Sequence, residues 1–196
     1  MIRKLVLLGA AAALIAALFP PAHAAPLSVS ARDNAFEPAN TKARIGQEVM
    51  WTNAASAQDA HNVREDRKIF YSGFAGSIEL SFSRVFSAGT FHYFCERHGF
   101  RRGGMDGTVK VPVKLLAAPA GPNFTVAWAT SASNTGSKYT IHYKIGSGMW
   151  KTWKSATSAL RATFKGAVAG KRYTFRAKSL EGDAASKWSP PASITA

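Results

Sequence analysis

A short segment near the middle of the chain contains the residues best suited to hold a metal. Cys95 is the only cysteine of the 196-residue chain, His98 follows it by three positions and Met105 by ten. A separate histidine, His61, lies upstream at the end of a polar loop. A thiolate, two imidazoles and a thioether are the ligand types of a trigonal copper site with a weak axial methionine. The four residues therefore predict a bound copper ion.

The first 24 residues have the pattern of a secretory signal. Residues 1–4 are basic, residues 5–19 form an apolar run of fifteen, and residues 22–24 are a small-x-small cleavage site. We expect cleavage before Ala25 and a periplasmic or extracellular location. A membrane anchor is the competing interpretation. The run is short for a bilayer span and no comparable run follows, so we expect no transmembrane anchor after cleavage.

Export makes the single cysteine more informative. A lone Cys95 cannot form an internal disulfide and would be open to oxidation unless it is buried or bound to a metal. A small buried hydrophobe is the ordinary alternative for such a residue, but His98, Met105 and His61 favour a metal. By strand alternation we expect His92 to lie on the face opposite Cys95.

The numbers of histidines and cysteines exclude two other classes of copper protein. Four histidines remain after signal cleavage, too few for the trinuclear cluster of a multicopper oxidase, and a single cysteine excludes a binuclear site with two bridging thiolates. His142 is expected to face outward from a strand elsewhere in the chain. The sequence contains no Ser-His-Asp set and no phosphate-binding loop, so we do not expect an enzyme.

Alternating apolar residues predict the strands that would hold these ligands. Residues 41–45 and 48–51 are expected to form two strands joined by a tight turn at residues 46–47. Further strands are expected in residues 27–31, 34–38, 61–64, 77–86, 91–95 and 107–111. Helical periodicity is almost absent. About 90 residues with this spacing predict a β-sandwich.

Four motifs in this region carry a family resemblance. They are Phe36-x-Pro38, Gly46-x-x-Val49-x-Trp51-x-Asn53, His61-Asn62-Val63, and Tyr93-x-Cys95-x-x-His98 continuing to Met105-x-Gly107. Over residues 25–114 the chain resembles the cupredoxins, the family of plastocyanin and azurin. The resemblance implies a Greek-key β-sandwich that binds one type 1 copper per chain and transfers single electrons between redox partners.

The resemblance also assigns roles to individual residues. His61, Cys95 and His98 match the equatorial copper ligands, and Met105 matches the axial one. Asn62 matches the position whose backbone amide approaches the cysteine sulfur and whose side chain ties two ligand loops together. The stretch between His98 and Met105 is longer than is usual in small cupredoxins. If Met105 is instead a core residue, either the carbonyl of Ala60 lies near the axial position or the copper site is three-coordinate.

A second all-β module is expected after a short linker. Residues 115–122 are rich in small residues, proline and glycine, which mark the linker. Residues 123–196 resemble a fibronectin type III module, an immunoglobulin-like β-sandwich. The resemblance rests on Trp128, Tyr139-x-Ile141-x-Tyr143, Gly170-x-x-Tyr173-x-Phe175-x-Ala177 and Ser186-x-Trp188-Ser189. It implies that Tyr173 is the tyrosine-corner residue.

Positive charge is concentrated in this second module. Residues 25–114 have 12 basic against 9 acidic side chains, a net charge of +3, whereas residues 115–196 have 11 against 2, a net charge of +9. Such a field suits adhesion to an acidic partner, for example an anionic envelope polymer. A merely solvated surface explains it equally well. Nucleic acid is not expected, because no recognition motif is present.

Three functions remain open at this stage. The first is one-electron transfer, with Arg97, Arg101 and Arg102 around His98 as a docking rim for an acidic redox partner. The second is buffering or delivery of copper outside the cytoplasm without a redox role. The third is an adhesion or scaffolding protein whose copper site is vestigial.

Overall fold

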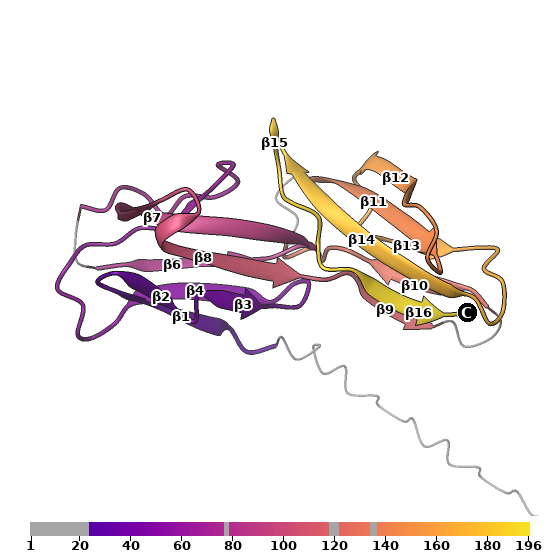
Figure 1. Ribbon diagram of the computed structural model, residues 1–196, viewed down its shortest axis with the longest axis horizontal. Coiled ribbons are helices and arrows are strands. Elements are labelled where there is room, and N and C mark those ends of the chain that lie inside the picture. Colours follow the sequence, from indigo (N-terminus) through magenta and orange to yellow (C-terminus); the bar gives the residue numbers. More distant parts are fainter. Residues whose placement is uncertain (1–23, 77–78, 118–121, 134–136) are drawn as a thin grey trace, which may run out of the picture.

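Every regular element of the described structure is a β-strand. The computed structural model describes residues 24–196 apart from 77–78, 118–121 and 134–136. Within these residues there are sixteen strands and no helix, which confirms the all-β prediction (Figure 1). The expected signal lies outside the described residues except for Ala24. In the part of the chain described, no helix is long and apolar enough to cross a membrane.

The first half of the chain forms two four-stranded sheets. One has the order β2-β1-β4-β6 and the other β3-β8-β7-β5. Their strands are β1 (Leu27–Arg32), β2 (Ala35–Glu37), β3 (Asn40–Lys42), β4 (Glu48–Asn53), β5 (Arg64–Glu65), β6 (Ser81–Val85), β7 (Gly89–Phe100) and β8 (Gly103–Val111). The core between them is aromatic. Trp51 is fully buried and its ring packs against those of Phe70, Phe82 and Tyr93.

The turn at residues 46–47 has a different role from the one its sequence suggests. Gln47 donates a backbone hydrogen bond to the carbonyl of Arg44, and Gly46 has a positive φ of 76°, so the tight turn is present. However, β3 pairs with β8 whereas β4 pairs with β1 and β6. The turn therefore carries the chain from one sheet to the other and does not close a hairpin.

Of the strand expected at residues 61–64, only Arg64 belongs to an observed strand, the two-residue β5. Only β5 is a strand, because the backbone amide of Val63 bonds to the Ser72 hydroxyl at 2.8 Å instead of joining a ladder. His61 consequently lies in a loop. In the strand expected over residues 77–86, β6 occupies Ser81–Val85, and residues 77–78 lie outside the described residues.

The second half also forms two sheets, with the orders β13-β10-β9 and β12-β11-β14-β15, and β16 pairs with β14. The strands are β9 (Lys114–Ala117), β10 (Phe124–Ala127), β11 (Lys138–Ile145), β12 (Lys151–Thr157), β13 (Arg161–Phe164), β14 (Arg172–Glu181), β15 (Ala184–Ala185) and β16 (Ala192–Thr195). β9 pairs with β10, so residues 115–117 of the expected linker belong to a sheet. The Tyr173 hydroxyl accepts a hydrogen bond from the Val168 amide at 2.9 Å, the arrangement of a tyrosine corner.

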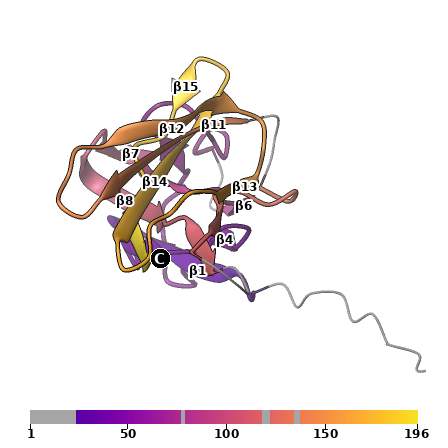
Figure 2. The same cartoon turned by 90° about the vertical axis from the view of Figure 1, so that its right-hand side faces the viewer.

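The two sandwiches lie one after the other along the long axis and are bonded at their junction (Figures 1 and 2). Thr90, at the start of β7, exchanges two backbone hydrogen bonds of 3.1 Å with Lys187. Arg84 donates to both carboxylate oxygens of Glu181, at 2.6 and 2.8 Å. The strand that carries Cys95 is therefore bonded at its other end to the second module.

Candidate metal centre

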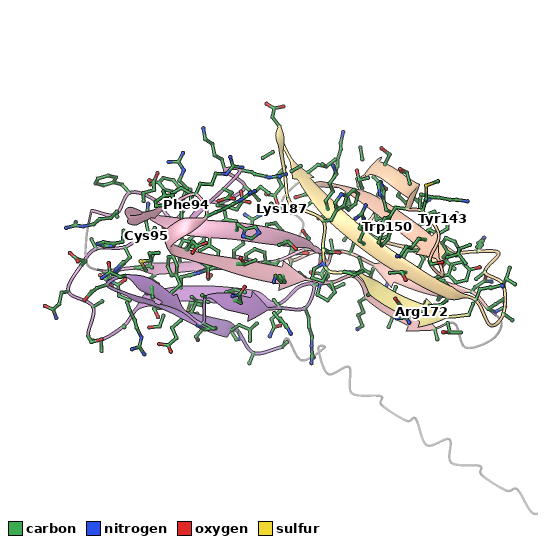
Figure 3. The ribbon with its side chains drawn as sticks, viewed as in Figure 1. Phe94, Cys95, Tyr143, Trp150, Arg172 and Lys187 are labelled. Atoms are coloured by element: carbon green, nitrogen blue, oxygen red, sulfur yellow. The ribbon has the colours of Figure 1, made fainter. Side chains whose placement is uncertain are left out.

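Strand alternation places Cys95 on the core face of β7. Phe91, Tyr93 and Cys95 are buried, with Cys95 fully so, and the residues between them are only half-buried. Burial raises the pKa of Tyr93 to about 12, so its ring beside this face stays neutral. His92 lies on the other face, where its Nδ1 contacts the Thr108 hydroxyl at 2.9 Å. Figure 3 shows Cys95 toward the end of the first sandwich remote from the second.

A large bulge in the β7–β8 hairpin brings Met105 opposite the segment that holds Cys95 and His98. Phe94 pairs with Asp106 and Gly99 with Gly104, so residues 95–98 of β7 face Met105 alone on β8. Such bulges redirect side chains beside functional sites. Met105 is buried in the same core cluster as Cys95. Its burial also satisfies the core interpretation, so its role as axial ligand stays a prediction.

Cys95 and His98 lie at the separation that two ligands of one metal ion require. The Sγ of Cys95 is 3.7 Å from the Nδ1 of His98. Metal–sulfur and metal–nitrogen bonds of about 2.3 and 2.0 Å, set at the roughly 120° of a trigonal site, separate the two donor atoms by about 3.7 Å. The ring of His61 joins them, its centroid 4.9 Å from that of His98.

His61 has a nitrogen that the protein leaves unsatisfied. Its Nδ1 is 3.2 Å from the amide oxygen of Asn53, which can only accept, so this nitrogen carries the proton. The Nε2 is buried and has no hydrogen-bond partner in the described residues. Burial, together with the charge of His98, lowers the pKa of His61 and so favours the neutral ring. A neutral imidazole with a buried free lone pair fits a metal ligand.

His98 links the buried thiol to the surface. Its side chain is 13% exposed, and its Nε2 lies 3.4 Å from Asp59 Oδ2 while its Nδ1 faces Cys95. A carboxylate on the outer nitrogen orients an imidazole ligand and makes it a better donor. Asp59 is itself held by Asp33, whose Oδ1 accepts hydrogen bonds from the backbone amides of Gln58 and Asp59.

Asn62 ties the loop of His61 to the strand of Cys95. Its Oδ1 accepts from the Glu96 amide at 2.8 Å, and its Nδ2 donates to the Glu96 carboxylate at 2.7 Å and to the Gly73 carbonyl at 2.9 Å. Burial works to raise the pKa of Glu96, but hydrogen bonds from Arg64, Asn62 and Tyr71 outweigh it, so this pKa lies below its usual range. The tie between loops that the resemblance implies is thus present.

The candidate ligand side chains lie near one another, but they do not form a complete metal site. In the described residues no group of three or more His, Cys, Asp or Glu side chains is arranged to hold a metal ion. Cys95 and His98 face each other, and the Nδ1 of His61 is directed to Asn53. Asn53 entered the sequence prediction only as part of a motif, and no role was predicted for Asn53, Asp59 or Glu96. Asp59 and Glu96 are close in sequence to His61 and Cys95, which is the only signal that could have indicated them.

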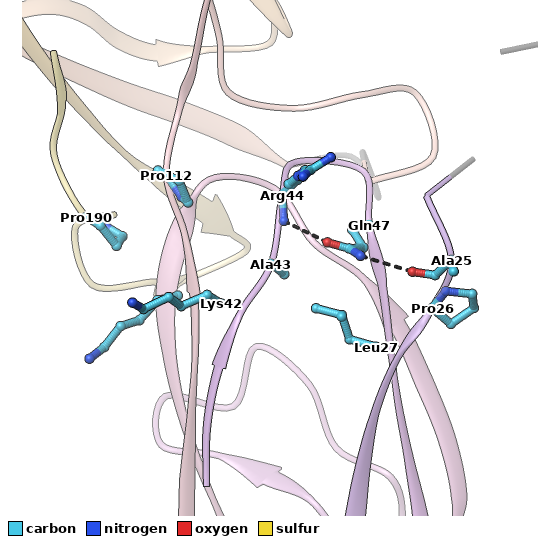
Figure 4. A pocket seen from close by; sticks show the side chains of 10 residues that line it. Ala25, Pro26, Leu27, Lys42, Ala43, Arg44, Gln47, Pro112 and Pro190 are labelled. Carbon is cyan, nitrogen blue, oxygen red and sulfur yellow. Dashed lines mark hydrogen bonds between the residues drawn. The ribbon is translucent and has the colours of Figure 1, made fainter. Parts of the chain in front are cut away.

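A separate hollow lies near the junction of the two modules (Figure 4). It has a volume of about 650 Å³, and its lining is mostly apolar with three cations, Lys42, Arg44 and Lys110. Gln47 accepts a hydrogen bond from the Arg44 amide and donates one to the Ala25 carbonyl at its edge. This lining offers no nucleophile or metal-binding side chain.

Comparisons with known proteins give only remote likenesses. No protein-family model and no curated protein matches the chain. Similar solved structures include a myokine (14% identity, TM-score 0.37, 44% of this chain and 93% of that one), the twitchin kinase region from C. elegans (24%, 0.34, 44% and 16%) and a Cu(I) form of an amicyanin variant (25%, 0.32, 46% and 86%). At these TM-scores the likenesses do not establish a family.

Proposed function

We propose that this chain is an exported copper protein that transfers single electrons. One type 1 copper ion would be held by His61, Cys95 and His98, with Met105 as the axial ligand. The observation that carries the proposal is the 3.7 Å separation of Cys95 Sγ and His98 Nδ1 at a hairpin bulge whose opposite strand presents Met105. The buried, unpartnered Nε2 of His61 supports it. Export rests on the signal pattern alone.

The protein around the site favours a fixed, dry set of ligands. Phe91 and Tyr93 are buried on the same strand face as Cys95 and exclude water from the thiol. Asn62 holds the two ligand segments together through Glu96. When bound, copper supplies a one-electron couple whose two oxidation states both accept a trigonal thiolate and imidazole set, so little reorganisation is needed.

The surface near His98 suits a transient redox partner. Phe100, two residues after His98, is 68% exposed, and Phe74, which is 87% exposed, lines a hollow together with Glu96 and Arg97. The basic rim is partly neutralised, because Arg97 lies 3.4 Å from Asp59, and Arg101 and Arg102 each lie 3.4 Å from Asp66. Apolar contact should therefore contribute to docking alongside attraction to an acidic partner.

Copper buffering or delivery is the second candidate, and one observation favours it. Within the part of the chain that the structure describes, no group of three or more His, Cys, Asp or Glu side chains is arranged to hold a metal ion, so the metal-free ligand set is not fully preorganised. Such a site gives up part of its binding energy to rearrangement and would release copper more readily. Rapid copper loss to a chelator, without a reversible midpoint potential, would identify this function.

The decisive experiment is addition of Cu(II) to purified residues 25–196. We expect an intense visible band from thiolate-to-copper charge transfer, lost in Cys95→Ser. In Met105→Leu the band should remain and the midpoint potential should shift. Voltammetry then separates electron transfer from buffering. A wild-type protein that stays colourless with Cu(II) would refute the type 1 site.

A further inference from the structure

The outer face of the second module carries cations stacked on indole rings. The guanidinium carbon of Arg176 lies 4.2 Å from the ring centroid of Trp150 and 4.5 Å from that of Trp188. The Nζ of Lys144 lies 5.3 Å from Trp150, and that of Lys178 lies 5.2 Å from Trp188. We call these five residues and His142, whose ring centroid is 4.2 Å from that of Trp188, the cation–indole ladder.

Two strands and two flanking segments build this ladder. On β14, Phe175 and Ala177 are buried while Arg176 and Lys178 are half-buried, so alternation points the two cations outward. His142 on β11 is directly opposite Arg176. Trp188 comes from the segment after β15, where its carbonyl accepts a hydrogen bond from the Thr90 hydroxyl at 2.9 Å. The ladder is therefore built on a rigid sheet.

The positive charge of the ladder is not compensated within the described residues. None of its Lys or Arg side chains has a carboxylate within ion-pair distance there. Residues 115–196 contain only two acids, and one of them, Glu181, is engaged by Arg84. Burial lowers the pKa of His142, and the nearby charges of Arg176 and Lys178 lower it further. Neighbouring cations thus repel one another on this face.

Positively charged side chains are also present at the junction between the two modules. Burial lowers the pKa of Lys187 and the positive charge of Arg102 lowers it further; the charge of Asp66 opposes this, and Arg67 and Arg101 add smaller lowering effects. Arg67 also donates to the Ala185 carbonyl at 3.0 Å, which holds it beside the second module. Figure 3 shows Trp150 on the second module and Lys187 nearer the junction. The basic side chains therefore extend from the second module to the junction.

We propose that the cation–indole ladder and Lys187 bind a linear anionic polysaccharide. Cations two residues apart on β14 are about 7 Å apart, so successive acidic groups of an extended polymer can meet successive cations. Single-stranded nucleic acid needs free aromatic faces for base stacking, but cations and His142 cover these indoles. A lipid surface needs apolar side chains that insert; the ladder itself contains no aliphatic one, but Ile145 and Met149 are exposed beside it, so the test includes lipid vesicles.

Binding of polygalacturonate, a carboxylated polysaccharide, to metal-free residues 25–196 tests this inference. The ladder variant Lys144→Gln/Lys178→Gln keeps Arg176 and both indoles, so the fold is retained. The matched control, Arg161→Gln/Lys165→Gln, removes two exposed charges at β13 in the other sheet. We expect the ladder variant to bind about tenfold more weakly and the control less than about twofold. A second variant, Lys187→Gln, should also weaken binding.

Several outcomes would overturn the inference. Equal losses in the ladder variant and the control would show that net charge alone attracts the polymer. Absence of polygalacturonate binding at low salt would show that the ladder is only structural. A thymidine oligonucleotide of matched charge, or vesicles containing an anionic lipid, that binds more tightly than the polysaccharide would assign the face to another class of partner. None of these outcomes depends on copper, so the proposed redox function is tested separately.

Discussion

Replacing Asn62 with alanine should destabilise the metal-free fold strongly, because this one side chain holds the two ligand segments together. It is 1% exposed and makes three hydrogen bonds, two of them to Glu96. Two bonds to neutral backbone groups contribute about 1 kcal/mol each, and the bond to a carboxylate about 1.5–3 kcal/mol. We therefore expect the free energy of unfolding to fall by about 3–5 kcal/mol in Asn62→Ala.

Urea denaturation of residues 25–196, followed by tryptophan fluorescence, measures this change. Gln47→Ala is the control, since Gln47 also makes two amide hydrogen bonds but near the surface, and we expect it to lose less than about 1 kcal/mol. In Asn62→Ala the copper charge-transfer band should also weaken or shift. A loss below about 1 kcal/mol in Asn62→Ala would refute the view that this network holds the ligand loops together.

Two further predictions concern buried charges. Arg84 and Glu181 are 17% and 16% exposed and share two short hydrogen bonds across the junction. A double-mutant cycle of their alanine variants, measured by urea denaturation, should give a coupling energy of about 1.5–3 kcal/mol. A coupling energy below about 0.5 kcal/mol would mean that the pair does not link the modules. Burial raises the pKa of Glu65 above its ordinary 4.5. The folded state then holds the proton more tightly, so the contribution of Glu65 to stability is fully present below pH 4.5 and is lost as the pH rises through the folded pKa. Glu65→Gln should remove this slope between pH 4 and 8, and an unchanged slope in the variant would contradict the assignment.

Local patterns in the sequence predicted much of the ligand strand. The alternation around Cys95 places it on the core face of β7 and His92 on the other, because neighbouring strand residues point to opposite sides. The β11 and β14 strands, and the hydrogen-bonded hydroxyl of Tyr173, follow from equally local patterns. These features depend on neighbours in sequence, which a single chain displays directly.

Features that join distant residues could not be predicted in this way. The Asn62–Glu96 bonds connect residues 34 positions apart, and Asn53 reaches His61 from the end of β4. The turn after β3 leads to another sheet because pairing with β8 and β1 is decided by the whole sandwich. Spacing alone does not specify such long-range contacts; the resemblance identified Asn62 as the tie between the ligand loops, but not Glu96 as its partner, nor Asn53 and Asp59 as the side chains beside the two histidines.

The junction has a consequence for both proposals. Thr90 is bonded to Lys187 through its backbone and to the Trp188 carbonyl through its hydroxyl. The start of β7 is thus attached to the cation–indole ladder, and the same strand carries Cys95. Because this connection is a continuous hydrogen-bonded strand and not a flexible tether, a polymer bound along the second module would hold the metal centre in a fixed orientation.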